Sequence, residues 1–134
     1  SSNTLNPVEQ ARLFGLMGKY QERNSAAYTA TEIWQHLMAS HQAFPFGSGR
    51  LKEGAPADLV IWDLYQPDTF PFYSPISAIL YSSNSQNVKY TMVAGEFLKY
   101  NGKLKIDTKT LTQEAVRLQK ALLERGKGKA QVAY

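Results

Sequence analysis

The chain has 134 residues, enough for one modest domain with a real hydrophobic core. Of these residues 43% are hydrophobic and 19% are charged, which is usual for a globular protein in water. The absence of cysteine excludes a disulfide scaffold and a cysteine-ligated zinc site, and it is compatible with a reducing compartment. No apolar run reaches the roughly 18–20 residues that cross a membrane, so we expect no membrane partner and a cytoplasmic location.

The net charge of +4 comes largely from the end of the chain. An anionic partner would explain this excess, but the solvated face of a helix explains it better, because no aromatic residues are interleaved with the basic ones. We therefore expect no nucleic-acid partner. The basic residues concerned are Arg117, Lys120, Arg125, Lys127 and Lys129.

A first helix is predicted over residues 6–23. Asn6 can cap it, and Pro7 suits the first helical position. Gly15 and Gly18 weaken a helix, and such glycines often mark close packing against another element.

A second helix is predicted from the Thr-x-x-Glu capping box at residues 29–32. It should end near Ala43, because Pro45 disfavours the helical conformation at Phe44.

Strands follow the two helices. Residues 58–63 form a short apolar run that predicts a buried strand, and residues 88–106 predict a three-stranded meander. The turns of the meander are Ala94-Gly95 and Asn101-Gly102. Residues 76–81 can form either a brief strand or a helical turn.

The last predicted element is a helix over residues 107–126, capped by Asp107 or Thr108 and closed near Gly126. Residues 127–134 are expected to be a loose tail. Helices, then strands, then a helix indicate an α+β fold or pieces of two larger units. The apolar stripe of the last helix is Leu111, Ala115, Leu118 and Leu122.

The chain contains few residues of the kinds that usually form catalytic or metal-binding sites. His36 and His41 are five residues apart, so they do not share one helix face, and no third metal ligand is evident. We therefore predict no metal site and no catalytic residue in this chain, although an enzyme built on these two histidines stays a minor alternative. The sequence Gly47-Ser48-Gly49 predicts a flexible connector rather than a phosphate-binding loop.

Asp58 and Asp63 flank the predicted strand. Side chains alternate along a strand, so two residues five apart point to opposite faces and do not form an acid/base pair. We expect Asp58 to accept backbone N–H groups of the turn at residues 53–57, and Asp63 to end the strand in the same manner.

Aromatic residues cluster around prolines in the middle of the chain. They can line a ligand groove, which would make residues 65–75 the site of a non-enzymatic binding module. We favour the other reading, in which they lie across a core and cover it. The aromatic residues are Phe44, Phe46, Phe70, Phe72 and Tyr73.

Residues 49–64, "GRLKEGAPADLVIWDL", resemble a pattern of the small β-sandwich domain in the amidohydrolase superfamily. Residues 88–104, "VKYTMVAGEFLKYNGKL", resemble the hairpin that follows in that family. The matching residues are Gly49, Leu51, Gly54, Ala57, Asp58, Leu59, Val60 and Asp63, and then Thr91, Val93, Gly95 and Gly102.

Residues 1–13, "SSNTLNPVEQARL", and 29–40, "TATEIWQHLMAS", resemble the last barrel loop and helices of the cytosine deaminase, adenosylhomocysteine deaminase and chlorohydrolase branch of the superfamily. Residues 106–124, "IDTKTLTQEAVRLQKALLE", resemble the family's C-terminal helix. The resemblance implies the terminal helices of a (β/α)₈ barrel at 1–46, part of a composite sandwich at 47–106, a C-terminal helix at 107–126 and a tail at 127–134. The passage at residues 41–49 departs from the family pattern, being shorter and carrying Phe44-Pro45-Phe46.

The resemblance also implies a metal-dependent parent enzyme that uses zinc or iron to hydrolyse a C–N (or C–Cl) bond of a nitrogen heterocycle or amidine. None of the family's metal-ligand motifs is present here, so no cofactor is assigned to this chain. Ser1, Ser2 and Asn3 would lie beside the active site by proximity only. We expect an inactive fragment that needs the missing barrel portion or self-association, from a homo-oligomeric parent.

Overall fold

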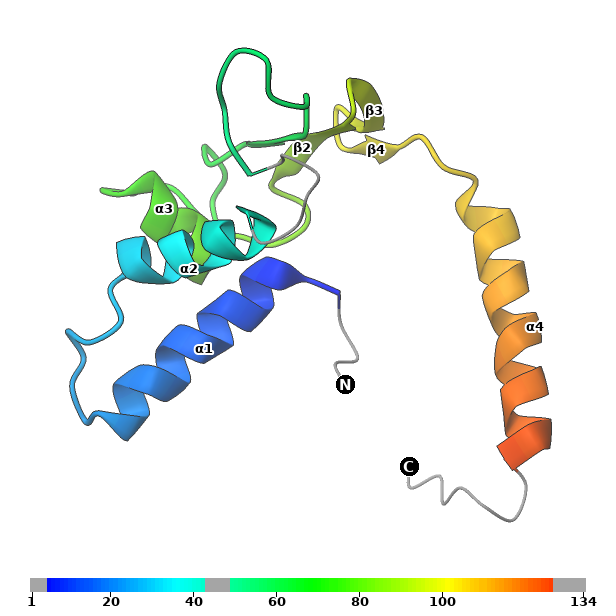
Figure 1. Cartoon of the computed structure of the whole chain (residues 1–134), viewed down its shortest axis with the longest axis horizontal. Coiled ribbons are helices and arrows are strands. Elements are labelled where there is room, and N and C mark those ends of the chain that lie inside the picture. Colours follow the sequence, from blue (N-terminus) through cyan, green and yellow to red (C-terminus); the bar gives the residue numbers. More distant parts are fainter. Residues whose placement is uncertain (1–4, 43–48, 127–134) are drawn as a thin grey trace. The chain divides into compact units, whose positions relative to one another are not determined.

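The computed structural model describes residues 5–42 and 49–126. It divides into two compact units, of which the first ends at Lys103 and the second begins at Leu104. The elements follow one another in this order (Figure 1): α1 (Pro7–Gln21), α2 (Ala30–Gln42), β1 (Leu59–Trp62), α3 (Pro75–Ser77), η1 (Ala78–Ser82), β2 (Val88–Val93), β3 (Glu96–Tyr100), β4 (Lys103–Leu104) and α4 (Thr108–Gly126).

The start of α1 is confirmed. The Asn6 side chain accepts the backbone N–H groups of Val8 and Glu9 at 3.2 and 3.3 Å. The expected close packing is also confirmed, because a Cβ atom added to Gly15 would lie 2.2 Å from Cδ1 of Ile33.

The capping box of α2 is confirmed as well. The Thr29 backbone N–H donates to Oε2 of Glu32 at 2.7 Å, and the Glu32 N–H donates to the Thr29 hydroxyl at 3.3 Å. The helix is described as far as Gln42, and its predicted end at Ala43 lies outside the described residues. Phe44 and Phe46 lie outside the described residues.

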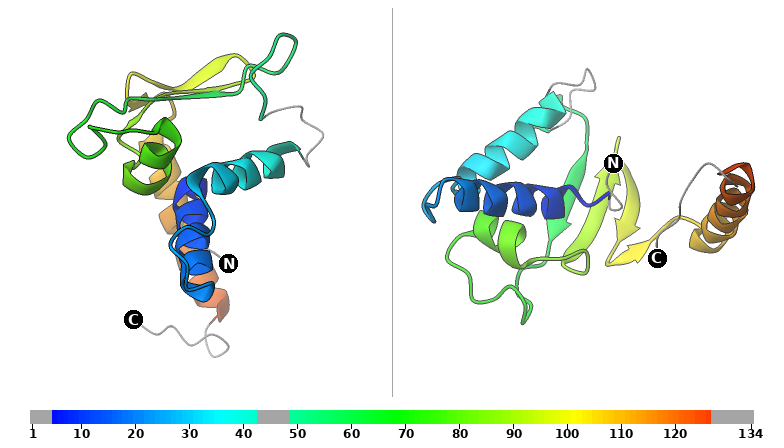
Figure 2. Two further views of the ribbon diagram at one scale, coloured as in Figure 1. Left: turned by 90° about the vertical axis from the view of Figure 1, so that its left-hand side faces the viewer. Right: turned by 90° about the horizontal axis from the view of Figure 1, so that it is seen from below.

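The hydrophobic core of the first unit lies between α1, α2 and η1. Ile33 is 1% exposed and Leu80 is fully buried, and Ala11 packs with both. These helical elements gather on one side of the sheet in both views of Figure 2. The strand alternative for residues 76–81 is wrong, since α3 and η1 are helical and the Ser74 hydroxyl caps α3 through the Ser77 N–H.

Arg12 joins α1 to the end of η1. Its Nε donates to the carbonyl oxygen of Leu80 at 2.6 Å, and its Nη2 donates to that of Ser83 at 2.7 Å. The last carbonyl groups of a helix lack intrahelical partners, so one guanidinium satisfies two of them here.

Arg12→Met is expected to lower the free energy of unfolding by about 1.5–3 kcal/mol, because methionine keeps an apolar stem but loses charged hydrogen bonds. Urea unfolding followed by circular dichroism measures this difference. Arg23→Met is the control, since Arg23 is exposed and should cost less than about 0.5 kcal/mol. Equal losses in the two variants would show that the Arg12 contacts contribute nothing.

The sheet has the strand order β1-β2-β3-β4. β1 pairs antiparallel with β2, with Leu59 opposite Met92, and β2 pairs antiparallel with β3, with Val93 opposite Glu96. The predicted meander is confirmed, and β1 extends it by one strand. Its two turns have positive φ at both central residues, 49° and 84° at 94–95 and 47° and 79° at 101–102, as type I′ turns require.

Much apolar surface of the first unit is open to solvent. On α1, the residues concerned recur at i, i+3, i+4 and i+7, so they share one face of the helix. Val60 and Ile61 of β1 are also about half exposed, at 52% and 51%. The exposed residues on α1 are Leu13, Leu16, Met17 and Tyr20.

The second unit contains α4. The Asp107 side chain accepts the backbone N–H groups of Lys109 and Thr110, both at 3.1 Å, so the predicted cap is confirmed. None of the residues of α4 is buried.

Candidate functional site

The two histidines do not form a metal site with other described residues. His36 is exposed on α2, and its ring meets Phe14 edge-on with the centroids 6.2 Å apart. The side chain of His41 lies outside the described part of the chain. Within that part, no group of three or more histidine, aspartate or glutamate residues could hold a metal ion.

Asp58 is held by a different turn from the one expected. Its Oδ1 accepts the backbone N–H of Ala94 at 2.8 Å, so the prediction that the turn at residues 53–57 supplies the donor is wrong. The pairing of β1 with β2 brings the 94–95 turn beside the start of β1 and places a free N–H there. The Ala57 carbonyl accepts the N–H of Gly95 at 3.2 Å in the same place.

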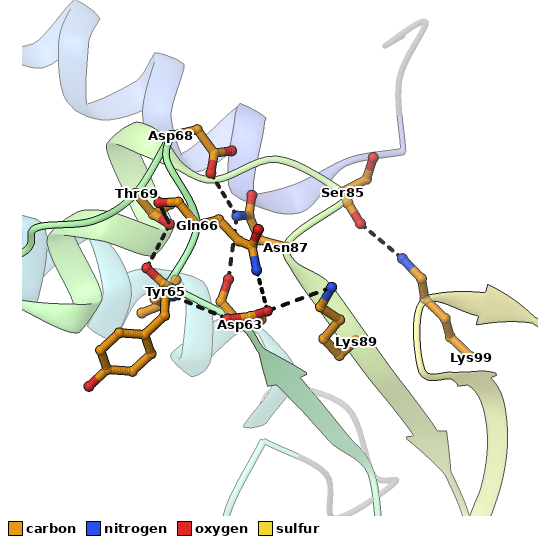
Figure 3. Close-up of polar contacts among 10 residues, drawn as sticks. Asp63, Tyr65, Gln66, Asp68, Thr69, Ser85, Asn87, Lys89 and Lys99 are labelled. Atoms are coloured by element: carbon orange, nitrogen blue, oxygen red, sulfur yellow. Dashed lines mark hydrogen bonds and ion pairs between the residues drawn. The ribbon is translucent and has the colours of Figure 1, made fainter.

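Asp63 ends β1 as turn chemistry predicts, and Figure 3 shows its contacts. Its Oδ1 accepts the backbone N–H of Tyr65 at 3.1 Å, and its Oδ2 accepts the Gln66 side-chain amide at 2.5 Å. The Lys89 ammonium of β2 lies 3.6 Å from Oδ2. Asp58 and Asp63 are thus each engaged with a separate turn rather than with one another.

A buried asparagine ties this turn to the start of β2. Asn87 is 2% exposed, and its side-chain amide donates to the Asp63 carbonyl at 3.4 Å and to Oδ1 of Asp68 at 3.1 Å. Its Oδ1 accepts the Asn84 N–H at 2.8 Å. The buried Thr69 hydroxyl donates to the Leu64 carbonyl at 2.8 Å beside it. Because these polar groups satisfy one another, this network stabilises the fold.

The pKa of Asp63 is lowered, first by the hydrogen bond from Gln66, then by the Tyr65 N–H and by the charge of Lys89. A carboxyl whose pKa is lower in the folded state adds stability that is fully present above its unfolded pKa of about 3.9 and is lost as the pH falls through the folded pKa. Asp63→Asn should therefore be less stable than the unsubstituted chain at pH 6, with a difference that narrows below about pH 4. Thermal melting between pH 6 and pH 2 measures this, and a difference independent of pH would contradict it.

The aromatic loop is open to solvent. The ring centroids of Tyr65, Phe70 and Phe72 lie 5.6–6.3 Å apart. Phe70 is 54% exposed and Tyr73 is fully exposed, so the expectation that the loop covers a core is wrong for these two residues.

The remaining residues singled out by the sequence fall into two groups. Ser1, Ser2 and Asn3 lie outside the described residues. The others occupy turns with positive φ, namely Gly49, Gly54, Gly95 and Gly102, with φ between 77° and 84°. Among the helices described, none is both long and apolar enough to cross a bilayer.

Known proteins are similar to this chain in sequence. The pattern of the Amidohydrolase family matches residues 39–98. The 5-methylthioadenosine/S-adenosylhomocysteine deaminase of Caldicellulosiruptor saccharolyticus is 35% identical over 127 residues, which cover 92% of this chain. This chain belongs to the amidohydrolase family. The 5′-deoxyadenosine deaminase of Methanopyrus kandleri is 36% identical over 108 residues, or 78% of the chain.

Two solved structures of larger proteins share the fold of this chain over part of their own length. An adenosine deaminase from Xanthomonas campestris with bound zinc superposes with a TM-score of 0.81 at 23% identity, over 91% of this chain and 29% of its own. A triazine hydrolase variant gives 0.69 at 21% identity, over 83% and 25%. The chain likewise spans only 30% and 25% of the two deaminases named above.

The structural roles of two polar residues, Asn87 and Arg12, were not predicted from the sequence. Asn87 stands at the end of the polar run "SSNSQN", which signals a turn but not a buried side chain. In the sequence, Arg12 is one charged residue of a predicted helix. The carbonyl groups that accept its hydrogen bonds lie 68 and 71 residues further along the chain, so no local pattern indicates them.

Proposed function

We propose that this chain is the C-terminal part of an amidohydrolase-type enzyme that hydrolyses a C–N (or C–Cl) bond of a nitrogen heterocycle or amidine. The observation that carries this proposal is the 35% identity to a deaminase over 92% of the chain. The relatives named above act, by their names, on adenosine derivatives, so an aminopurine is the first substrate class to test.

The described residues of this chain do not fit a catalytic metal, because they offer no set of three ligands. The zinc in the Xanthomonas structure supports a metal-dependent reaction for the complete enzyme. The ligands for zinc or iron would then come from polypeptide equivalent to the remainder of the relatives. A cytoplasmic location stays a prediction.

The role proposed for this chain is scaffolding. Arg12, Asn87 and the core around Ile33 hold the helices and the sheet together. The exposed face of α1 and the half-exposed β1 then provide apolar surface for a companion polypeptide, since a soluble protein rarely leaves large apolar patches open. In this proposal the complete enzyme is a homo-oligomer.

Co-expression tests the proposal. The companion is the part of the Caldicellulosiruptor deaminase outside the region that this chain matches, and the assay is ammonia release from S-adenosylhomocysteine, 5-methylthioadenosine and other aminopurines. We expect activity only when both polypeptides are present. A companion that binds this chain yet gives no ammonia release from any aminopurine would contradict the proposed reaction.

The second candidate is a non-enzymatic binding module that uses residues 65–75. The exposure of Phe70 and Tyr73 favours it, because aromatic faces on an open loop can stack on a flat ligand or pack against a protein. A Phe70→Ala, Tyr73→Ala double variant separates the two candidates. Loss of ligand binding in the absence of metal supports the binding module, whereas unchanged ammonia release in the co-expressed enzyme supports the scaffold.

A further inference from the structure

The apolar stripe of α4 is symmetric along the helix. Leu111, Ala115, Leu118 and Leu122 follow one another at intervals of 4, 3 and 4 residues, which keeps them on one face. The three leucines are 59%, 47% and 64% exposed. Intervals of 4 and 3 are those of the seam between two paired helices.

From this symmetry we infer that α4 pairs antiparallel with α4 of a second copy of the chain. The intervals read the same in both directions, so an antiparallel partner places Leu111 opposite Leu122 and Ala115 opposite Leu118. Each small residue then faces a large one, which allows the two helices to approach to about 8–10 Å.

Charge at the two ends of the helix fits the same partner. In the register set by the stripe, Arg125 of one copy faces Thr108 of the other. Thr108 directly follows Asp107, so the Arg125 guanidinium lies near the Asp107 carboxylate of the partner helix. This places opposite charges together at both ends of the pair. Asp107 lies at the positive end of the helix dipole and Arg125 at the negative end, and antiparallel packing also opposes the two dipoles.

The outer face supports the same orientation. Lys109, Arg117, Lys120 and Glu124 fall on the side away from the stripe and stay in solvent. Glu114 lies at the edge of the seam, where Arg117 donates two hydrogen bonds to it and partly neutralises its charge. A parallel pair in the same register would instead bring Arg125 beside Arg125.

Sedimentation equilibrium of the full chain measures the association. Leu118→Glu is expected to weaken it at least about a hundredfold, because both copies lose a buried leucine. Leu123→Glu is the matched control, since Leu123 is also 47% exposed but lies off the stripe. A monomeric unsubstituted chain, or equal weakening by the two variants, would overturn the inference. The inference would also be overturned if the association disappears when the companion polypeptide binds to the same stripe.

Two further measurements test the orientation. Asp107→Asn keeps an oxygen that can cap the helix but removes the charge, so it should weaken the pair a few-fold at low salt and not at 0.5 M salt. The chain has no cysteine, so a mixture of Ala115→Cys and Leu118→Cys chains should form the mixed disulfide. Disulfides that form only between identical variants would indicate a parallel pair and overturn the proposed register.

Discussion

Ile33→Ala is expected to lower the free energy of unfolding by about 2–5 kcal/mol, the largest effect of any single substitution we propose. Ile33 is 1% exposed, and it fills the space beside Gly15 of α1 and Leu80 of η1. Alanine leaves a cavity at the point where three helical elements meet. Urea unfolding of the full chain, monitored by circular dichroism at 222 nm, measures the difference.

Ile61→Ala is the control for Ile33→Ala. The same atoms are removed, but Ile61 of β1 is 51% exposed, so the expected cost is below about 1 kcal/mol. Similar losses in the two variants would mean that the core does not lie between α1, α2 and η1.

Asn87→Ala is expected to lower the free energy of unfolding by about 2–4 kcal/mol, because three hydrogen bonds of about 1 kcal/mol each disappear and a part-buried N–H and carbonyl lose a partner. The affected partners lie on the turn after β1 and on the turn before β2. Hydrogen exchange should therefore speed up in both turns while protection in α1 stays unchanged.

Gln86→Ala is the control for Asn87→Ala. Gln86 precedes Asn87 in the same turn, but its side chain is exposed, so the substitution should change stability by less than about 0.5 kcal/mol. Faster exchange confined to the second turn would show that Asn87 does not join the two turns.

The local parts of the fold were predictable from the sequence. Asn6, Thr29 and Asp107 bond to backbone groups two or three residues away, so their roles follow from short patterns. The turns at 94–95 and 101–102 follow from the freedom of Gly95, Asn101 and Gly102 at positive φ, although Ala94 also adopts a positive φ, which few alanines do.

Long-range pairings were not predictable in the same way. Asp58 was expected to use the nearest turn, but its donor is Ala94, 36 residues away. Short patterns do not specify which distant N–H will lie beside a carboxylate, because that depends on how β1 pairs with β2. The exposure of the loop around Phe70 depends equally on what packs against it.

Two histidines five residues apart cannot supply a set of metal ligands by themselves, so the absence of a metal site from this chain stays a prediction. The most direct test of the scaffold role is the zinc content of the purified chain, alone and co-expressed with the companion polypeptide. We predict no stoichiometric zinc on the chain alone, and zinc together with ammonia release in the complex, both unchanged by His36→Ala. Stoichiometric zinc and ammonia release with the chain alone, both abolished by His36→Ala or His41→Ala, would contradict this account.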